Sequence, residues 1–134
     1  MQIRYVNIAD HGDERGSLIV FEQYKNVPFD IKRTYCVYGT KLGVRRGFHA
    51  HKELNQIAIV LHGSCSFLLD DGVTRKNVEL NSPTQGLFID PMIWHEMFDF
   101  THDCVLLMLA SEVYDESDYI RNYDEFSASV NCNK

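Results

Sequence analysis

The stretch GVRRGFHAHKELNQ, residues 43–56, together with the glycine at position 63, decides the fold of this 134-residue chain. His49 and His51 are separated by one residue, and side chains with this spacing on a β-strand point to the same face. If that face is the interior of a barrel, the two imidazoles share a pocket. A pair of this kind taken alone is more typical of a solvent-exposed strand, so the residues around it have to decide between the two interpretations.

Short apolar or alternating segments recur about every ten residues on both sides of this stretch, which is typical of β-sandwiches and barrels. We expect strands at residues 17–22, 31–38, 56–61, 66–69, 73–80, 86–90, 95–98 and 104–110. In the segment 115–126, Tyr119, Tyr123 and Phe126 have the spacing of one helix face, which predicts a helix there. The last residues, 131–134, are expected to fray. The chain is therefore predicted to be one all-β domain, residues 1–134, with one short C-terminal helix.

The glycines and histidines of the opening stretch match the spacing of the first cupin motif, G-x5-H-x-H-x4-E-x6-G. A second segment, from Gly86 through Pro91 and His95 to Asp99, resembles the second cupin motif, although it lacks one glycine and ends in Asp. The resemblance implies a double-stranded β-helix, or jelly-roll barrel. Gln56 stands where a metal-binding cupin has glutamate.

This substitution bears directly on metal binding. A neutral amide is a weaker ligand than a carboxylate and cancels no charge of a divalent ion. His49, His51 and His95 remain an alternative three-histidine metal site. The favoured interpretation is that no metal or other cofactor is bound and that the imidazoles are free for acid–base chemistry, because their ordinary pKa suits proton transfer near neutral pH.

The composition is that of an ordinary globular protein, with 45% hydrophobic and 24% charged residues. A net charge of −6 argues against nucleic acid or an anionic membrane as a partner. Cys36, Cys65, Cys104 and Cys132 form no C-x-x-C pair, so no thiolate zinc site is expected. The first three lie among apolar residues and are predicted to be buried and reduced. With no signal-peptide core and no long apolar stretch, we expect a cytoplasmic protein.

Beyond the cupin motifs, nearly the whole chain resembles the dTDP-4-keto-6-deoxyglucose 3,4-ketoisomerases of bacterial deoxysugar biosynthesis. The segments that carry this resemblance are residues 15–18 (RGSL), 28–33 (PFDIKR), 46–52 (RGFHAHK), 61–65 (LHGSC), 69–72 (LDDG), 91–97 (PMIWHEM) and 115–123 (DESDYIRNY). The resemblance implies an isomerase that moves the keto group of dTDP-4-keto-6-deoxyglucose from C4 to C3 through an enediol. The product would serve the synthesis of deoxy- or aminosugars for surface glycans such as lipopolysaccharide O-antigen or S-layer glycan.

The same resemblance implies roles for particular residues. His49 would be the base at carbon, and His51 would assist proton transfer between the hydroxyl and carbonyl oxygens. Arg33 and Arg46 would bind the diphosphate, since guanidinium matches paired phosphate oxygens. Tyr35 has the same strand parity as Arg33 and is therefore placed in the pocket, whereas Tyr38 is not.

Four further residues complete the predicted substrate site. Trp94 is interpreted either as a stacking platform for the nucleotide or as a core residue. Gln56 is expected to face the substrate. Arg15 and His95 are similar to residues of the family branch that gives the 3-keto-6-deoxygalactose product. The family also implies a homodimer with exchanged N-terminal strands.

Two other functions remain open at this point. A 3,5-epimerase is another cupin enzyme that acts on the same nucleotide sugar with a histidine base. A non-catalytic sugar-nucleotide-binding protein or sensor is also compatible with the fold, because a fold alone does not define a function.

Overall fold

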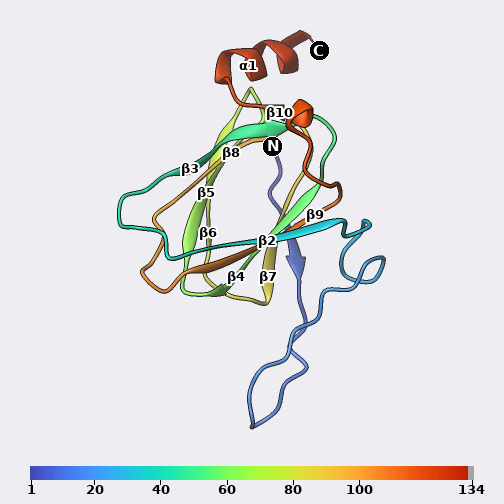
Figure 1. The fold of residues 1–134 in the computed structure, drawn as a ribbon, viewed down its shortest axis with the longest axis vertical. Helices are drawn as coiled ribbons and strands as arrows, with labels where there is room; N and C mark the ends of the chain where they lie inside the picture. The colour runs from blue at the N-terminus through green and yellow to red at the C-terminus, as the bar shows by residue number, and fades with distance from the viewer. Residues whose placement is uncertain (133–134) are drawn as a thin grey trace.

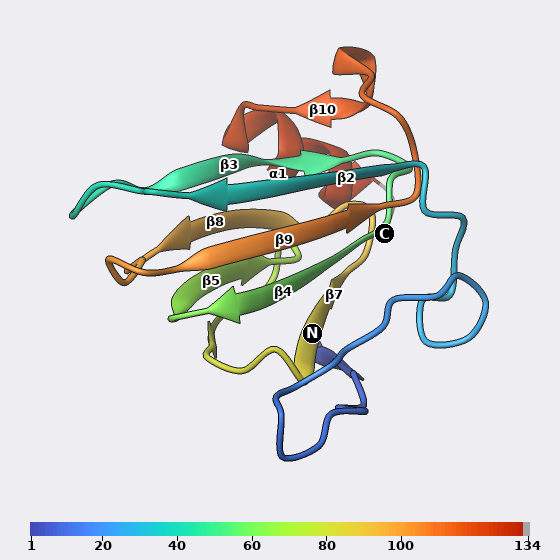
Figure 2. The same ribbon diagram turned by 60° about the horizontal axis from the view of Figure 1, so that its bottom comes forward.

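The computed structural model describes residues 1–132, whose strands form two antiparallel five-stranded sheets (Figures 1 and 2). The first sheet has the order β1 (Arg4–Asn7), β7 (Gln85–Ile89), β4 (Gln56–His62), β9 (Val105–Ala110) and β2 (Arg33–Tyr38). The second has the order β10 (Tyr119–Ile120), β3 (Arg46–His51), β8 (Trp94–Phe98), β5 (Cys65–Asp70) and β6 (Arg75–Leu80). A 3₁₀ turn (Glu116–Asp118) precedes β10, and α1 (Tyr123–Cys132) follows it. The predicted all-β fold with one short C-terminal helix is confirmed.

The main core lies between the two sheets and follows from the alternation along each strand. Phe67, Leu87 and Met108 point inward and are fully buried. Burying side chains of this size stabilises the fold by roughly 1.5–3 kcal/mol each. The same interior also holds buried polar side chains, which are the imidazoles of β3 and β8 and the amide at the start of β4.

Each sheet is also covered on its outer face. Helix α1 lies against the second sheet, where Phe126 is fully buried in a cluster with Ala50, Trp94 and Ile120. On the first sheet, the segment that contains Val27 and Phe29 packs over Ile57, Ile59, Phe88 and Leu109. Outward-facing apolar residues of the strands are therefore buried as well.

The helix predicted over residues 115–126 is wrong in its first half. The Asp115 carboxylate accepts a hydrogen bond from the Ser117 backbone N–H (3.0 Å) and caps a single 3₁₀ turn. Tyr119 and Ile120 then pair with β3 and extend its sheet, because strand pairing satisfies their backbone groups. Helix α1 begins at Tyr123 and includes positions 131 and 132, so the chain does not fray from 131, and positions 133 and 134 lie outside the described residues.

The strand predicted over residues 17–22 is not formed. This segment belongs to an N-terminal arm that extends away from the barrel in both views (Figures 1 and 2), and it makes only an isolated bridge between Asp10 and Ile19. Leu18 and Val20 remain 57% and 40% exposed, whereas Phe21 packs against the cluster around Val27 and Phe29, so only part of the apolar alternation of this segment serves the core of its own chain. Cys36 also departs from prediction. It lies exposed on the outer face of edge strand β2, whereas Cys65 and Cys104 are buried.

Candidate active site

A pocket of about 370 Å³ opens between β2, the edge strand of the first sheet, and β3, which lies next to the short edge strand β10 of the second sheet. Both strands supply its walls, with further contributions from β8, β10 and the residue after β10. The lining residues are Arg33, Tyr35, Val37, Arg46, Gly47, His49, Met97, Tyr119 and Arg121. The pocket thus joins basic groups at its mouth to an imidazole at its base.

A β-bulge in β3 sets the direction of the His49 side chain. Gly47 pairs with Glu96 and His49 pairs with His95, which leaves Phe48 as the extra residue. Gly47 has φ of 93°, and a Cβ there would lie 2.8 Å from the His95 carbonyl oxygen, so glycine is required. Phe48 adopts φ of 60° and is 44% exposed.

His49 and His51 both face the interior, as their spacing predicts. Their ring centroids lie 5.0 Å apart, and the His95 ring lies 4.5 Å from that of His49. The Nδ1 atom of His49 is 3.1 Å from the Gly47 carbonyl oxygen, and Nδ1 of His51 is 3.1 Å from Asp118 Oδ2. Both neighbours can only accept, so each Nδ1 carries the hydrogen and each Nε2 keeps its lone pair.

These lone pairs are buried and accept no hydrogen bond from another protein group; His49 lines the pocket, and His51 lies beside it in the interior. Among residues 1–132, the buried side-chain nitrogens and oxygens without a hydrogen-bond partner are His49 Nε2, His51 Nε2 and Arg33 Nε. Buried polar atoms in proteins are nearly always paired, and unpaired ones cluster at functional sites. Two acceptors and one donor are thus available here to a bound molecule.

His95 differs from the other two histidines because its Nε2 is already paired. Its Nδ1–H donates to the Ile93 carbonyl (3.1 Å), and the Gln56 amide N–H donates to Nε2 (3.2 Å). The hydroxyl of Tyr35 in turn donates to the Gln56 oxygen (3.3 Å). This chain of hydrogen bonds crosses the interior from one sheet to the other, and it directs an N–H group toward the histidine cluster.

The three histidines bring their nitrogens within 4.8 Å of one another, which is the spacing of a possible metal site. The remaining groups do not fit such a site. Gln56 occupies the His95 lone pair that a metal would need, and no negative charge is supplied by the amide. The donor set therefore suits proton transfer better than cation binding.

Burial keeps all three imidazoles neutral near pH 7. Loss of hydration lowers the pKa of His49 and takes that of His95 well below its ordinary value. It lowers the pKa of His51 to about 4, assisted by the neighbouring His49 and opposed by Asp118. Burial also raises the pKa of Tyr35 to about 12. The site therefore offers unprotonated bases at neutral pH.

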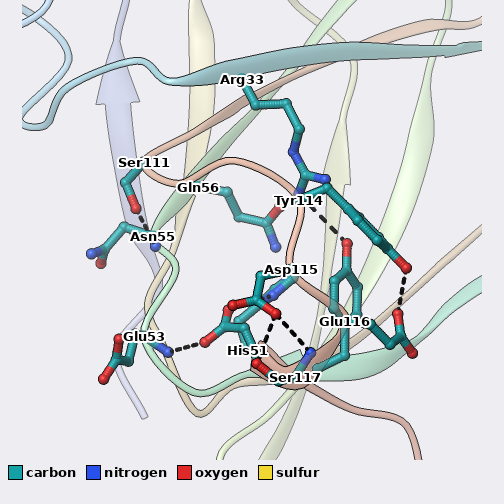
Figure 3. A network of polar contacts seen from close by, with 12 residues as sticks. Arg33, His51, Glu53, Asn55, Gln56, Ser111, Tyr114, Asp115, Glu116 and Ser117 are labelled. Atoms are coloured by element: carbon teal, nitrogen blue, oxygen red, sulfur yellow. Dashed lines mark hydrogen bonds and ion pairs between the residues drawn. The ribbon is translucent and has the colours of Figure 1, made fainter.

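The basic residues lie at the pocket mouth. The Arg33 guanidinium lies over the rings of Tyr35 (5.2 Å) and Tyr114 (5.6 Å), while Arg46 is exposed at the start of β3. Figure 3 shows Arg33 approaching the polar network around Tyr114 and Glu116. A positively charged mouth of this kind is suited to an anionic ligand such as a diphosphate.

Sequence reasoning missed Tyr119 and Arg121. The Tyr119 ring lies 5.0 Å from His49 and 4.4 Å from His51. The Arg121 guanidinium lies 4.2 Å from the Tyr119 ring and forms an ion pair with Glu116 (2.6 Å). The family resemblance does include residues 115–123, but assigning this segment to a helix removed it from the site.

His51, Gln56 and His95 are buried next to His49 and are not among the residues that line the pocket, and two predicted substrate-binding residues lie farther away. Trp94 is 3% exposed, packs against Tyr123 and Phe126 beneath α1, and donates its indole N–H to Glu96 (2.8 Å). Of its two interpretations, the structure supports the core residue and not the stacking platform. Arg15 lies on the exposed arm, where its guanidinium pairs with Asp13 (2.6 Å), and it does not line the pocket.

The fold and site together define a class, a cupin-type barrel with a cluster of buried neutral histidines next to an arginine-lined pocket. The profile of the FdtA family, described as WxcM-like, C-terminal, matches residues 1–131. A TDP-4-oxo-6-deoxy-alpha-D-glucose-3,4-oxoisomerase from Aneurinibacillus thermoaerophilus is 48% identical, with 100% of this chain and 99% of that protein aligned. The chain therefore belongs to the FdtA family of sugar-nucleotide 3,4-ketoisomerases, which are intramolecular oxidoreductases.

Solved structures agree with this assignment. A 3,4-ketoisomerase from Helicobacter canadensis is 48% identical, with a TM-score of 0.94 and 98% of both chains covered. The 3,4-ketoisomerase QdtA from Thermoanaerobacterium thermosaccharolyticum, solved as a mutant in complex with TDP-4-keto-6-deoxyglucose, is 44% identical. Its TM-score is 0.95, with 97% of this chain and 94% of that chain covered. Within residues 1–132, no helix has the length and apolar character needed to cross a membrane.

Proposed function

We propose that this enzyme converts TDP-4-keto-6-deoxyglucose to a TDP-3-keto-6-deoxyhexose. The observation that carries the proposal is the pair of buried, unpartnered Nε2 lone pairs of His49 and His51 below an arginine-lined mouth. The diphosphate would lie between Arg33 and Arg46, and the sugar ring would reach the imidazoles.

The reaction requires one proton to move between carbons and one between oxygens. The ketone at C4 acidifies the hydrogen on C3, which His49 removes to give an enediol. His51 passes the hydroxyl proton from the C3 oxygen to the C4 oxygen. Return of a proton to C4 then leaves the ketone at C3. Each positioned acid–base group is typically worth about 10²–10⁴-fold in rate.

We further propose that the proton returns to the face of C4 that gives the galacto product. Arg15 and His95 support this, because they are similar to residues of the galacto-forming branch of the family. His95 lies 4.5 Å from His49, measured between ring centroids, and so stands beside the reacting carbons in this proposal.

A homodimer with exchanged N-terminal strands completes the proposed site. The arm carries exposed Leu18, Val20 and Tyr24, and apolar residues on an unpaired segment favour pairing with a second copy. Exchange would bring Arg15 to the partner's pocket. We place the enzyme in the cytoplasm, in the synthesis of deoxy- or aminosugars for surface glycans.

The deciding experiment is incubation with TDP-4-keto-6-deoxyglucose, followed by NMR of the fresh product and of its borohydride-reduced form. A ketone at C3 with an axial C4 hydroxyl supports the full proposal. A ketone that stays at C4 with inverted C3 and C5 would indicate a 3,5-epimerase, and binding without turnover a non-catalytic protein. An equatorial C4 hydroxyl would refute the galacto assignment alone.

Light scattering during size-exclusion chromatography tests the dimer, which a monomeric mass would contradict.

A further inference from the structure

Asp118, the last residue of the 3₁₀ turn, lies next to the histidine cluster and has a carboxylate with two separate partners. Its Oδ2 is 3.1 Å from His51 Nδ1, and its Oδ1 accepts the backbone N–H of Glu53 (2.8 Å). Figure 3 shows His51 and Glu53 beside the turn that begins at Asp115. The carboxylate therefore connects the end of β3 to the turn before β10.

The position of Asp118 is fixed from several directions. Its backbone carbonyl accepts the Lys52 N–H (2.9 Å), and its backbone N–H donates to the Asp115 carbonyl (3.0 Å). Tyr119, the next residue, pairs with His51 in the β10–β3 ladder. The Asp118 side chain is only 15% exposed and that of His51 only 2%, so the contact between them is shielded from solvent.

His51 and His49 differ in the partner of Nδ1. For His49 it is the neutral carbonyl of Gly47, whereas for His51 it is a carboxylate. A carboxylate fixes the tautomer and also stabilises the imidazolium that forms when the ring accepts a proton. His49, His95 and Arg33 all lie close enough to disfavour a positive charge on His51. Asp118 supplies the opposing negative charge.

We propose that Asp118 is a positioning residue for catalysis, which holds the hydrogen of His51 on Nδ1 and keeps its Nε2 lone pair free within the histidine cluster beside the pocket. The proposal rests on the proton-transfer role proposed above for His51. It adds a residue that acts through His51 and does not itself touch the sugar.

Replacing Asp118 by asparagine tests this without removing the link to Glu53. An amide has a single oxygen, and the Glu53 N–H needs that oxygen as its acceptor. The amide nitrogen then faces His51 Nδ1 as a donor, so Nδ1 must accept and the ring hydrogen moves to Nε2. If the asparagine amide turned the other way, its NH₂ group would face the Glu53 backbone N–H. Two donors would then meet without an acceptor, so this orientation is disfavoured. The variant thus reverses the tautomer with little change in shape.

For Asp118→Asn we expect kcat to fall at least about 100-fold, with the KM for TDP-4-keto-6-deoxyglucose and the affinity for TDP within about 3-fold of wild type. Nitrogen-15 NMR of the imidazoles should place the His51 hydrogen on Nδ1 in the wild type and on Nε2 in the variant. The His51 signals can be assigned by their loss in His51→Asn. Asp115→Asn, which weakens the cap of the same turn without touching His51, is the matched control and should resemble wild type in both measurements.

Three results would overturn the proposal. These are a kcat of Asp118→Asn within about 3-fold of wild type, a wild-type His51 with its hydrogen on Nε2, or an equal loss of kcat in Asp115→Asn. The wild-type NMR measurement remains decisive even if the variant does not fold. If the wild-type protein does not turn over the nucleotide sugar, the proposed function fails, whereas the tautomer measurements still decide the role of Asp118.

Discussion

At the scale of single residues, the three buried imidazoles are distinguished by what their nitrogens contact. His49 and His51 keep free Nε2 lone pairs, whereas the Nε2 of His95 accepts a hydrogen bond from Gln56. A base needs an available lone pair within reach of the proton it removes. The geometry therefore favours His49 and His51 for proton transfer and gives His95 a role in shaping the pocket.

His49→Asn is expected to lower kcat by at least about 10²-fold, because asparagine has no basic nitrogen at this position. Affinity for TDP should remain near the wild-type value, since the arginines at the mouth bind the nucleotide. His51→Asn should also be severe, but it can leave slow exchange of the C3 hydrogen with solvent deuterium. Steady-state kinetics and TDP calorimetry measure both effects, with exposed His62→Asn as the control. A near-native kcat for His49→Asn would disprove its assignment.

Gln56 leads to a prediction about metal ions. The wild-type enzyme should keep full activity after prolonged dialysis against a chelator, because the amide neither cancels charge nor frees the His95 lone pair. Gln56→Glu replaces the N–H donor by a carboxylate and should create a site that binds Zn²⁺ or Ni²⁺, measurable by calorimetry. Loss of wild-type turnover on chelation, with recovery on adding a divalent ion, would establish the three-histidine metal site instead.

At the scale of secondary-structure elements, the bulge in β3 controls where His49 points. Phe48 occupies the left-handed region, which is unfavourable for a bulky residue and costs on the order of 1–3 kcal/mol. Its side chain is half-exposed, so packing recovers only part of this cost. The surrounding pairs of Gly47 and His49 hold the conformation in place.

Two substitutions at Phe48 test this account. Phe48→Gly should keep kcat and leave the free energy of unfolding unchanged or higher, because glycine adopts positive φ without strain. Phe48→Val should lower the free energy of unfolding by about 1–2 kcal/mol and reduce kcat, because a β-branched residue resists this conformation. Urea denaturation and steady-state kinetics give both quantities. A valine variant more stable than the glycine variant would show that the bulge is not strained at this residue.

The elements also show what can be predicted from this sequence. Alternation predicted most strands, and the spacing of His49 and His51 correctly placed both in the interior, where His49 lines the pocket. It failed for residues 17–22, because alternation cannot tell whether a partner strand exists in the same chain. Helical spacing gave the wrong element for Tyr119. The spacing over residues 119–126 does not reveal that Asp115 caps a single turn or that a strand pair follows this turn. Arg121 and Asp118 were lost from the site for the same reason.

At the scale of the whole molecule, the buried histidines make stability depend on pH. In the unfolded chain a histidine titrates near pH 6.5, whereas burial lowers the pKa of His49, His51 and His95 in the folded protein. Below about pH 6.5 the unfolded chain therefore binds protons that the folded protein excludes. The free energy of unfolding should have its highest value above that pH. It should decrease as the pH falls toward 4, the approximate pKa of His51.

The expected slope follows from the number of protons. If all three imidazoles stay neutral in the folded state, the free energy of unfolding near pH 5 falls by about 4 kcal/mol per pH unit, or about 1.4 kcal/mol for each histidine. His51→Asn removes one of these groups and should reduce the slope by about one third, while its free energy of unfolding at pH 8 serves as the reference for any structural cost. Urea denaturation at several pH values between 5 and 8 measures both slopes. Identical slopes in the two proteins would mean that His51 is as easily protonated in the folded enzyme as in the unfolded chain. His51 would then not be a neutral base at pH 5, and the prediction would be wrong for that residue.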